Sequence, residues 1–262
     1  MSDAFIQSID ERGAATLTLN RPDRHNCFDD ALIADLTAAL LRLGEDAKVR
    51  AVILASTGRS FSAGADLDWM RRMASQPFDA NLADAGRLAD LMHTLDRLPK
   101  PTVALVQGAT YGGGVGLVAC CDVAIATESA VFCLSEVRLG LTPATISPYV
   151  LNAIGARWAR RYFQTAETFT AARAKEIGLV HEVVAAPALA AAAEGVVQAI
   201  LRGAPGAQAA AKELVFLCEG RPVNGALRAE TGRRIAERRS SAEGQEGIAA
   251  FLDKRAPDWR RN

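Results

Sequence analysis

Short apolar runs recur along the chain, and each gives way to a segment of helical spacing or to a glycine-rich turn. The runs at 14–20, 51–54, 103–106, 122–126 and 131–134 have the length and composition of strands. The first of them alternates apolar and polar residues, as a half-buried strand does. Strands that alternate with helices form a sheet with crossover connections. We therefore predict an α/β fold.

From about residue 186 the pattern changes to alanine-rich amphipathic helices with breaks at Gly203, Pro205 and Gly220. The 262 residues, 50% of them hydrophobic, suffice for one large core with an appendage. We predict a core over residues 1–200 and a C-terminal helical region over 201–262.

The composition argues against several classes of partner. Thirty basic residues balance thirty acidic ones, so we expect no nucleic-acid and no membrane partner. The start of the chain has no apolar leader pattern, and no run reaches the roughly 20 apolar residues of a membrane span, so we expect a cytoplasmic protein. The three histidines lack metal-ligand spacing and the five cysteines form no C-x-x-C pair. We predict neither a metal site nor disulfides.

A strand, a glycine turn and a short helix succeed one another around YGGGVGLVACCD, residues 111–122. Such a turn exposes the amides of a helix N-terminus, and glycine lets another group approach the backbone closely. Three interpretations compete: tight strand–helix packing, a dinucleotide site, and an oxyanion hole of backbone amides. The dinucleotide pattern G-x-G-x-x-G is not matched here. An oxyanion hole needs a second donor from elsewhere.

A second glycine turn, TGRSFSAGADL at 57–67, also follows an apolar run. Two such turns could each place one amide on a carbonyl oxygen. That arrangement suits enolate chemistry, in which negative charge develops on a thioester oxygen as a proton leaves or joins the α-carbon.

Three blocks of the sequence resemble, in order, the signature blocks of the enoyl-CoA hydratase/isomerase (crotonase) superfamily. They are FSAGADLDWM, VQGATYGGGVGLVACCDVAIAT and LSEVRLGLTPATISPYV. The last block and SAEGQEGIAAFLDKRAPDW are most similar to the bacterial methylglutaconyl-CoA hydratase type of leucine degradation. The resemblance covers nearly the whole chain. It implies a crotonase-type spiral of ββα units followed by a C-terminal helical region. It also implies that this region, residues 201–262, serves in oligomerisation or as a lid, and that the protein assembles into a homotrimer or homohexamer.

The resemblance also implies roles for individual residues. The amides of Ala65 and Gly113 would hold the thioester oxygen of an acyl-CoA substrate, with CoA arriving as part of that substrate and no other cofactor. Further CoA contacts would come from the first turn and from basic residues elsewhere: Ala63, Asp66, Leu67 and Asp68, Arg24 or His25, and, more weakly, Lys254 and Arg255. For each basic residue, a solvated loop or helix-end charge is the simpler alternative.

The acid/base residues depart from the family's pattern. Hydratases of the family carry two glutamates, and the resemblance places the second at Glu136 and the first at the position of Gly116. One carboxylate is therefore missing. We expect Glu136 to be catalytic, and we expect the space at Gly116 to admit water or a substrate group.

Three functions remain open at this point. A hydratase would use Glu136 both to activate water and to protonate the α-carbon, whereas a Δ3-Δ2-enoyl-CoA isomerase would use it to move a proton between two carbons. A non-catalytic acyl-CoA-binding protein would keep only the two amide donors. The flanking blocks favour the hydratase. A glutaconyl-type substrate has its own carboxylate, for which Arg71, Arg72 and Arg138 are candidate partners, although a surface or subunit-contact role is simpler for each.

Overall fold

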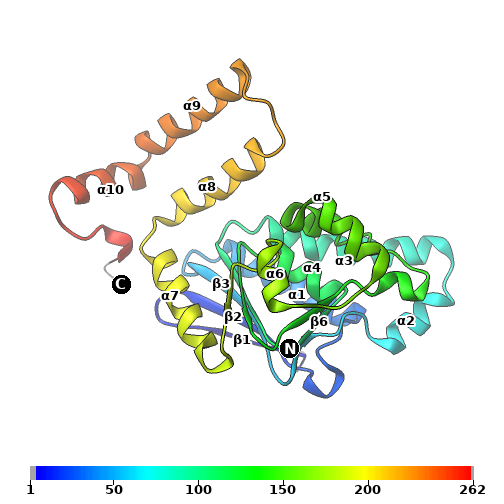
Figure 1. Ribbon diagram of the computed structural model, residues 1–262. Coiled ribbons are helices and arrows are strands. Elements are labelled where there is room, and N and C mark those ends of the chain that lie inside the picture. The colour runs from blue at the N-terminus through cyan, green and yellow to red at the C-terminus, as the bar shows by residue number, and fades with distance from the viewer. Residues whose placement is uncertain (1–3, 261–262) are drawn as a thin grey trace.

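The computed structural model describes residues 4–260, and its strands form a six-stranded and a four-stranded sheet (Figure 1). The large sheet has the order β1 (Phe5–Ile9), β2 (Ala14–Leu19), β3 (Ala51–Ser56), β5 (Thr102–Val106), β7 (Val123–Thr127), β10 (Glu182–Val184). The small sheet has the order β4 (Ser60–Ser62), β6 (Ala109–Tyr111), β8 (Val131–Cys133), β9 (Phe169–Thr170). Neighbouring strands are parallel except in the β1–β2 and β8–β9 pairs.

Successive units of the chain contribute one strand to each sheet and then a helical segment. The units are β3–β4 followed by α2 and α3, β5–β6 followed by α4, and β7–β8 followed by α5. The helices are α1 (Asp30–Glu45), α2 (Leu67–Ala74), α3 (Phe78–Asp96), α4 (Gly113–Cys120), α5 (Ser147–Thr165), α6 (Ala171–Glu176), α7 (Leu189–Leu201), α8 (Pro205–Cys218), α9 (Gly225–Ser240) and α10 (Ala242–Leu252). Short 3-10 turns are η1 (Pro22–Arg24), η2 (Glu136–Leu139), η3 (Ala186–Ala188) and η4 (Asp258–Arg260). The predicted α/β spiral of ββα units is confirmed.

Both faces of the large sheet are covered, as a parallel sheet requires. In β3, Val52 and Leu54 point into the main core with α1, α3 and α4, whereas Ile53 packs with Val197 of α7 on the opposite face. The alternation follows from the pleat, which turns successive side chains to opposite faces. The large sheet therefore separates the main core from a smaller apolar cluster beneath α7.

The predicted strands and helices of the core are found close to their expected positions. Helix α1 begins where Asp29 accepts a hydrogen bond from the amide of Leu32 at 2.9 Å, the usual role of an N-cap aspartate. The sequence does not predict the short strands β4, β6, β9 and β10, because two or three residues carry no periodicity.

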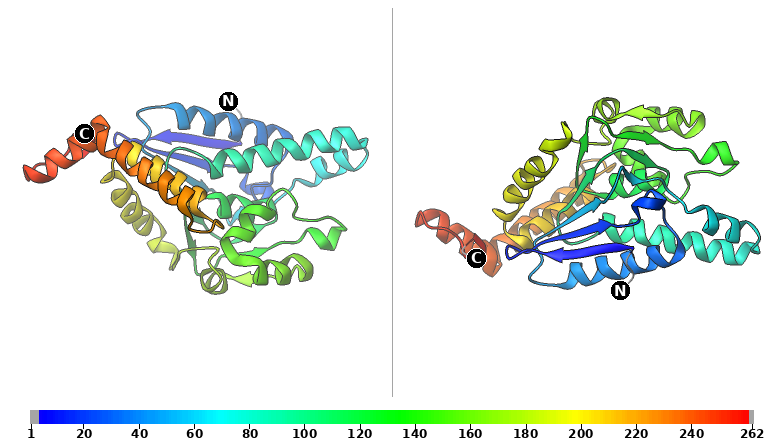
Figure 2. Two further views of the ribbon diagram at one scale, coloured as in Figure 1. Left: turned by 90° about the horizontal axis from the view of Figure 1, so that it is seen from above. Right: turned by 90° about the horizontal axis from the view of Figure 1, so that it is seen from below.

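The last three helices, α8, α9 and α10, project from the core, at the end opposite α2 and α3 (Figures 1 and 2). Helix α8 contacts the core through an ion pair of 2.9 Å between Lys212 and Asp122 and through Phe216, over whose ring the Arg97 guanidinium lies at 3.6 Å. The division into a core over 1–200 and a tail over 201–262 stays a prediction. Within residues 4–260, no helix has the length and apolar character needed to cross a membrane.

Arg50 ties the start of this tail to its end. Its guanidinium donates to the carbonyl of Gly203 at 2.7 Å and to that of Trp259 at 3.1 Å. The Trp259 indole in turn donates to the carbonyl of Arg202 at 3.2 Å. The C-terminal segment is therefore fastened to the junction that follows α7.

We expect Arg50→Met to loosen this junction. Hydrogen bonds from a charged donor contribute about 1.5–3 kcal/mol each, so the free energy of unfolding should fall by a few kcal/mol and proteolysis near residues 201–204 should accelerate. Urea unfolding and limited proteolysis measure both effects. Arg42→Met, at an exposed position of α1, is the matched control. Equal behaviour of the two variants would contradict the role given to Arg50.

Candidate active site

Three parallel strands of the small sheet end at one edge, and each leads into a predicted site residue. Strand β4 leads to Ala65, β6 to Gly113 and β8 to Glu136. The pairing is direct, since Ser62 of β4 opposes Thr110 of β6, and Tyr111 of β6 opposes Cys133 of β8. The carboxyl ends of adjacent parallel strands lie together, so the sheet collects these three residues from distant parts of the sequence.

Glycines bring the two turns into contact. A β-carbon on Gly64 would lie 3.0 Å from the carbonyl oxygen of Tyr111, and one on Gly114 would lie 2.8 Å from the carbonyl oxygen of Ser62. Gly64 and Gly112 also have positive φ angles of 88° and 51°, which side chains disfavour. Glycine at these positions therefore allows the two turns to pack against each other without a steric clash.

The amide of Ala65 is left free by the way its neighbours are bonded. Phe28 donates from its amide to the carbonyl of Gly64 at 2.8 Å and accepts from the amide of Asp66 at 2.7 Å. In such a parallel bridge the residue between the two bonded ones turns its own N–H the other way. Within residues 4–260, the Ala65 N–H has no hydrogen-bond acceptor.

The amide of Gly113 is free because it opens helix α4. The first N–H groups of a helix have no partner inside the helix, and no acceptor for this one lies within the described part of the chain. The preceding amide, of Gly112, donates to the carbonyl of Cys133 at 2.9 Å. Ala65 and Gly113 are half-buried, while Gly64 and Gly112 beside them are buried. Two free amides thus lie on adjacent, touching turns.

Glu136 begins the η2 turn and lies against the α4 turn. A β-carbon on Gly112 would be 3.1 Å from the Glu136 Oε1 atom. The other carboxylate oxygen, Oε2, is buried and has no hydrogen-bond partner among the described residues. Burial raises the pKa of the Glu136 carboxyl above its ordinary value, and a hydrogen bond from its own backbone amide partly opposes this. A raised pKa makes the carboxylate a better general base.

The expectation of open space at Gly116 is wrong. A β-carbon there would lie 2.3 Å from Cγ2 and 2.8 Å from Cβ of Ile146, and 3.2 Å from Sδ of Met92. Ile146 is 2% exposed, and its side chain occupies the space that a side chain at position 116 would need. Any residue larger than glycine at this position would have to displace Ile146.

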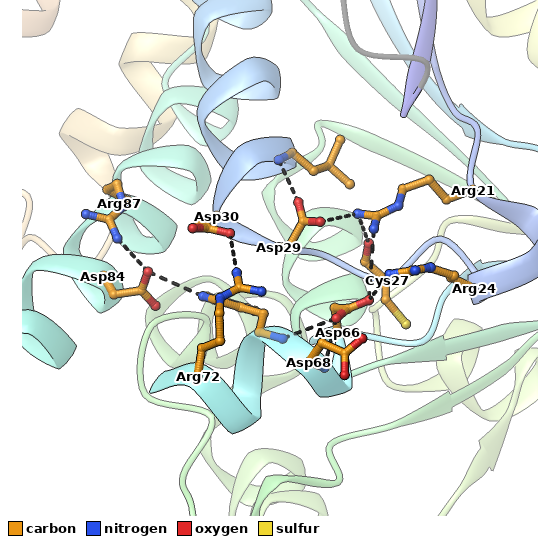
Figure 3. A network of polar contacts seen from close by, with 12 residues as sticks. Arg21, Arg24, Cys27, Asp29, Asp30, Asp66, Asp68, Arg72, Asp84 and Arg87 are labelled. Carbon is orange, nitrogen blue, oxygen red and sulfur yellow. Dashed lines mark hydrogen bonds and ion pairs between the residues drawn. The ribbon is translucent and has the colours of Figure 1, made fainter. Parts of the chain in front are cut away.

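Asp66 is occupied by structural contacts (Figure 3). Its carboxylate caps α2 by accepting from the amides of Asp68 and Trp69 at 2.9 and 3.2 Å, and it pairs with Arg24 at 3.3 Å. Burial opposes ionisation of Asp66, but these hydrogen bonds and the Arg24 charge lower its pKa overall. The half-exposed Arg24 guanidinium therefore lies beside the Ala65 turn, although one carboxylate already neutralises it.

The other predicted contact residues differ in their relation to the turns. Ala63 is half-buried and its amide donates to the carbonyl of His25 at 2.9 Å, whereas Leu67 and Asp68 are exposed at the start of α2. Lys254 follows α10, at the end of the projecting tail, so this chain does not bring it to the turns (Figure 1). Arg255, next to it, is bound to Glu246 at 2.6 Å.

The three candidate arginines each have a partner within the chain. Arg71 pairs with Asp68 at 2.7 Å, Arg72 pairs with Asp30 at 2.8 Å, and Arg138 donates to the carbonyl of Ala166 at 2.5 Å. Over residues 4–260, no group of three or more histidine, cysteine, aspartate or glutamate side chains is placed to hold a metal ion.

Comparison with known proteins identifies the family. The enoyl-CoA hydratase/isomerase family model matches residues 10–262. The chain is 32% identical to a putative enoyl-CoA hydratase of Thermus thermophilus, over 95% of this chain and 98% of that one, and 31% identical to the 1,2-epoxyphenylacetyl-CoA isomerase of Escherichia coli, over 97% and 98%. The crystal structure of an enoyl-CoA hydratase from Shewanella pealeana superposes with a TM-score of 0.95 at 45% identity, covering 98% of this chain and 96% of that one. The chain belongs to the enoyl-CoA hydratase/isomerase family, within the crotonase superfamily.

Two residues at the site were not singled out from the sequence. Phe28 and Ile146 are apolar residues within longer blocks, and nothing in their neighbourhood marks them as more than core positions. Only the fold shows that one bonds across to the Ala65 turn and that the other fills the volume beside Gly116.

We expect Glu136→Gln to stabilise the protein at neutral pH. A pKa raised by burial means that the folded state disfavours the charged carboxyl. Removing the charge therefore helps increasingly as the pH rises above the ordinary glutamate value, and fully once the pH exceeds the raised pKa. At a pH below the ordinary glutamate value of about 4.3 both proteins are uncharged there, and the advantage disappears. Thermal unfolding at a series of pH values measures the difference. The exposed Glu128→Gln is the control, and a pH-independent difference would contradict the expectation.

We expect Gly116→Ala and Ile146→Ala to be coupled. Alone, the added methyl group should cost about 1–3 kcal/mol by overpacking and the deletion about 2–5 kcal/mol by leaving a cavity. Together they should cost less than the sum, because each relieves the defect of the other. Urea unfolding of the two single variants and the double variant tests this. Gly86→Ala, in open space on α3, is the control that should not destabilise. Additive costs would contradict direct contact.

Proposed function

We propose that the protein adds water across the 2,3 double bond of a short or branched enoyl-CoA, with a 3-methylglutaconyl-CoA-like substrate. One observation carries the proposal. The half-buried carboxylate of Glu136 has a buried, unpartnered oxygen and lies against the turn that carries the free amide of Gly113, while the free amide of Ala65 lies on the turn packed beside it. An acid/base group next to two free donors on adjacent turns suits chemistry through a thioester enolate.

The two amides would bind the thioester oxygen. As water adds to C3, the electrons of the double bond move toward C1 and negative charge builds on that oxygen. Fixed N–H donors stabilise the charge without reorganising, and loss of one such donor costs about 10²–10³-fold in rate. The Ala65 and Gly113 donors are backbone groups of anchored turns, so their directions are set before the substrate arrives.

Glu136 would handle both proton transfers. Its carboxylate accepts a proton from the attacking water as the water oxygen bonds to C3. The resulting carboxylic acid then gives that proton to C2, and the enolate electrons return to form the C2–H bond and restore the thioester carbonyl. Water is consumed and the carboxylate is regenerated. CoA enters as part of the substrate, and the proposal requires no metal or redox cofactor.

The preference for a glutaconyl-type acyl group rests on the resemblance of the sequence blocks and on charge. A distal carboxylate on the substrate would be repelled by a second fixed anion in a dry site, and the position of Gly116 holds the apolar Ile146 side chain instead. Arg71, Arg72 and Arg138 would have to exchange a partner within the chain to bind that carboxylate.

A Δ3-Δ2-enoyl-CoA isomerase is the second candidate. The filled volume at Gly116 favours it, because a proton shift between C4 and C2 needs one base and no water site. The same two amides would stabilise the dienolate.

We also propose that the protein assembles into homotrimers or homohexamers through the tail. Helices α8–α10 project from the core, and they and the loops that follow them expose apolar side chains: Val215, Val223, Ile235, Ile248, Phe251 and Leu252. Burial of such side chains favours self-association. Light scattering of the purified protein measures the mass.

Four thioesters offered to one purified sample test the activity: 3-methylglutaconyl-CoA, isohexenylglutaconyl-CoA, crotonyl-CoA and a 3-enoyl-CoA. We expect the glutaconyl substrates to be hydrated with the highest kcat/KM. We expect Glu136→Gln to lower kcat by about 10²–10⁴-fold while binding of a saturated acyl-CoA is retained. Glu128→Gln should behave as wild type.

Each other outcome selects a different function. Preference for crotonyl-CoA would overturn the glutaconyl assignment, and conversion of the 3-enoyl-CoA alone would make the protein an isomerase. Binding of acyl-CoA without turnover of any of the four would make it a binding protein. Unchanged rates in Glu136→Gln would remove Glu136 from the mechanism.

A further inference from the structure

We infer that Phe28 is the positioning residue that fixes both oxyanion donors relative to one another. The inference rests on the proposed function, because it concerns the amides that would bind the thioester oxygen. Phe28 precedes α1 and belongs to neither glycine turn, yet it contacts both.

The backbone of Phe28 sets the direction of the first donor. Its amide and carbonyl bond to Gly64 and Asp66 at 2.8 and 2.7 Å, on either side of Ala65. With both flanking peptides held, the Ala65 N–H has one direction available, away from Phe28. The Ala65 turn therefore cannot rotate without breaking two hydrogen bonds.

The ring of Phe28 sets the position of the second donor. A β-carbon on Gly113 would lie 2.8 Å from Cε2 and 3.1 Å from Cδ2 of that ring. The ring is therefore packed directly against the first residue of α4, and it is 1% exposed. The start of α4 cannot shift toward α1 without displacing a ring that the core encloses.

Phe28 is itself held firmly on both sides. Asn26, 1% exposed, donates to the carbonyls of Thr57 and Ser60 at 2.9 and 2.8 Å. Asp29 caps α1 and pairs with Arg21 at 2.7 Å, as Figure 3 shows. Because Phe28 is fixed in this way, it holds the amides of Ala65 and Gly113 in set positions relative to the core. Its ring and its backbone act on different donors, so only the ring contact is removed by substitution.

Phe28→Leu tests the role, with Phe169→Leu as the control. Phe169 is also buried and lies on β9, at the far edge of the small sheet from β4, so its truncation removes comparable core volume. The readout is the carbonyl stretching frequency of carbonyl-¹³C butyryl-CoA, a saturated thioester, bound to each protein. Hydrogen bonds to the carbonyl oxygen lower this frequency. We expect Phe28→Leu to lose a large part of the wild-type shift and Phe169→Leu to keep it.

Kinetics on the best substrate give a second readout. Misplacing one of two donors should lower kcat by about 10–10²-fold, somewhat less than complete loss of a donor. KM should change little, because the substitution keeps the backbone of Phe28 and with it the hydrogen bonds that hold the Ala65 turn. Phe28→Met, whose flexible side chain adapts more easily to the space left by the ring, replaces Phe28→Leu if that variant does not fold. A wild-type shift retained in the Phe28 variant, with unchanged kcat, overturns the role of Phe28 alone. Absence of any shift in the wild-type protein overturns the oxyanion assignment and the proposed function with it.

Discussion

The parallel pairing of β4, β6 and β8 is the constraint on which the site depends. Each strand is only three residues long, and none would be stable alone. Each directly follows a strand of the large sheet, β3, β5 or β7, whose two faces are buried by helices. We infer that packing of the large sheet stabilises the short strands that follow it. Their pairing then places three chain segments at one edge of the small sheet. Ala65, Gly113 and Glu136 come together because the parallel strands that precede them pair side by side and end at the same edge.

The two turns can approach each other closely because glycines at the contact points have no β-carbon. Gly64 faces a carbonyl of the neighbouring turn and Gly114 faces one of β4, each at a distance that a β-carbon would make too short. Gly113 leaves room for a ring instead of a carbonyl. The glycines of this segment therefore serve different contacts, and only Gly112 and Gly64 also need the backbone freedom of a positive φ. The two free amides therefore depend both on the close contacts that the glycines allow and on the positive φ angles of Gly64 and Gly112.

Much of this arrangement could be predicted from the sequence, for identifiable reasons. Strands such as β3 and β5 are continuous apolar runs, and α1 has both a periodic face and an N-cap, so local signals sufficed. Strands β4 and β6 are too short to show periodicity and exist only through their partners. The same holds for Ile146, which lies thirty residues beyond Gly116 in the sequence yet occupies the space beside it. No local pattern reveals which side chain fills a gap left by a glycine.

Ile146 fills the space beside Gly116, so the chemistry of the Glu136 carboxylate has to be considered without a second acid at position 116. Position 116 has no room for a carboxylate while Ile146 keeps its place, so α4 adds no second acid from that position. Oε2 of Glu136 is itself buried and has no partner among the described residues, and burial raises the pKa of its carboxyl. A carboxylate in such surroundings is a stronger base toward any proton donor that enters, because protonation relieves its desolvation. The absence of a second acid at position 116 therefore goes with the packing of Ile146 against Gly116, whereas the basicity of Glu136 goes with its own burial.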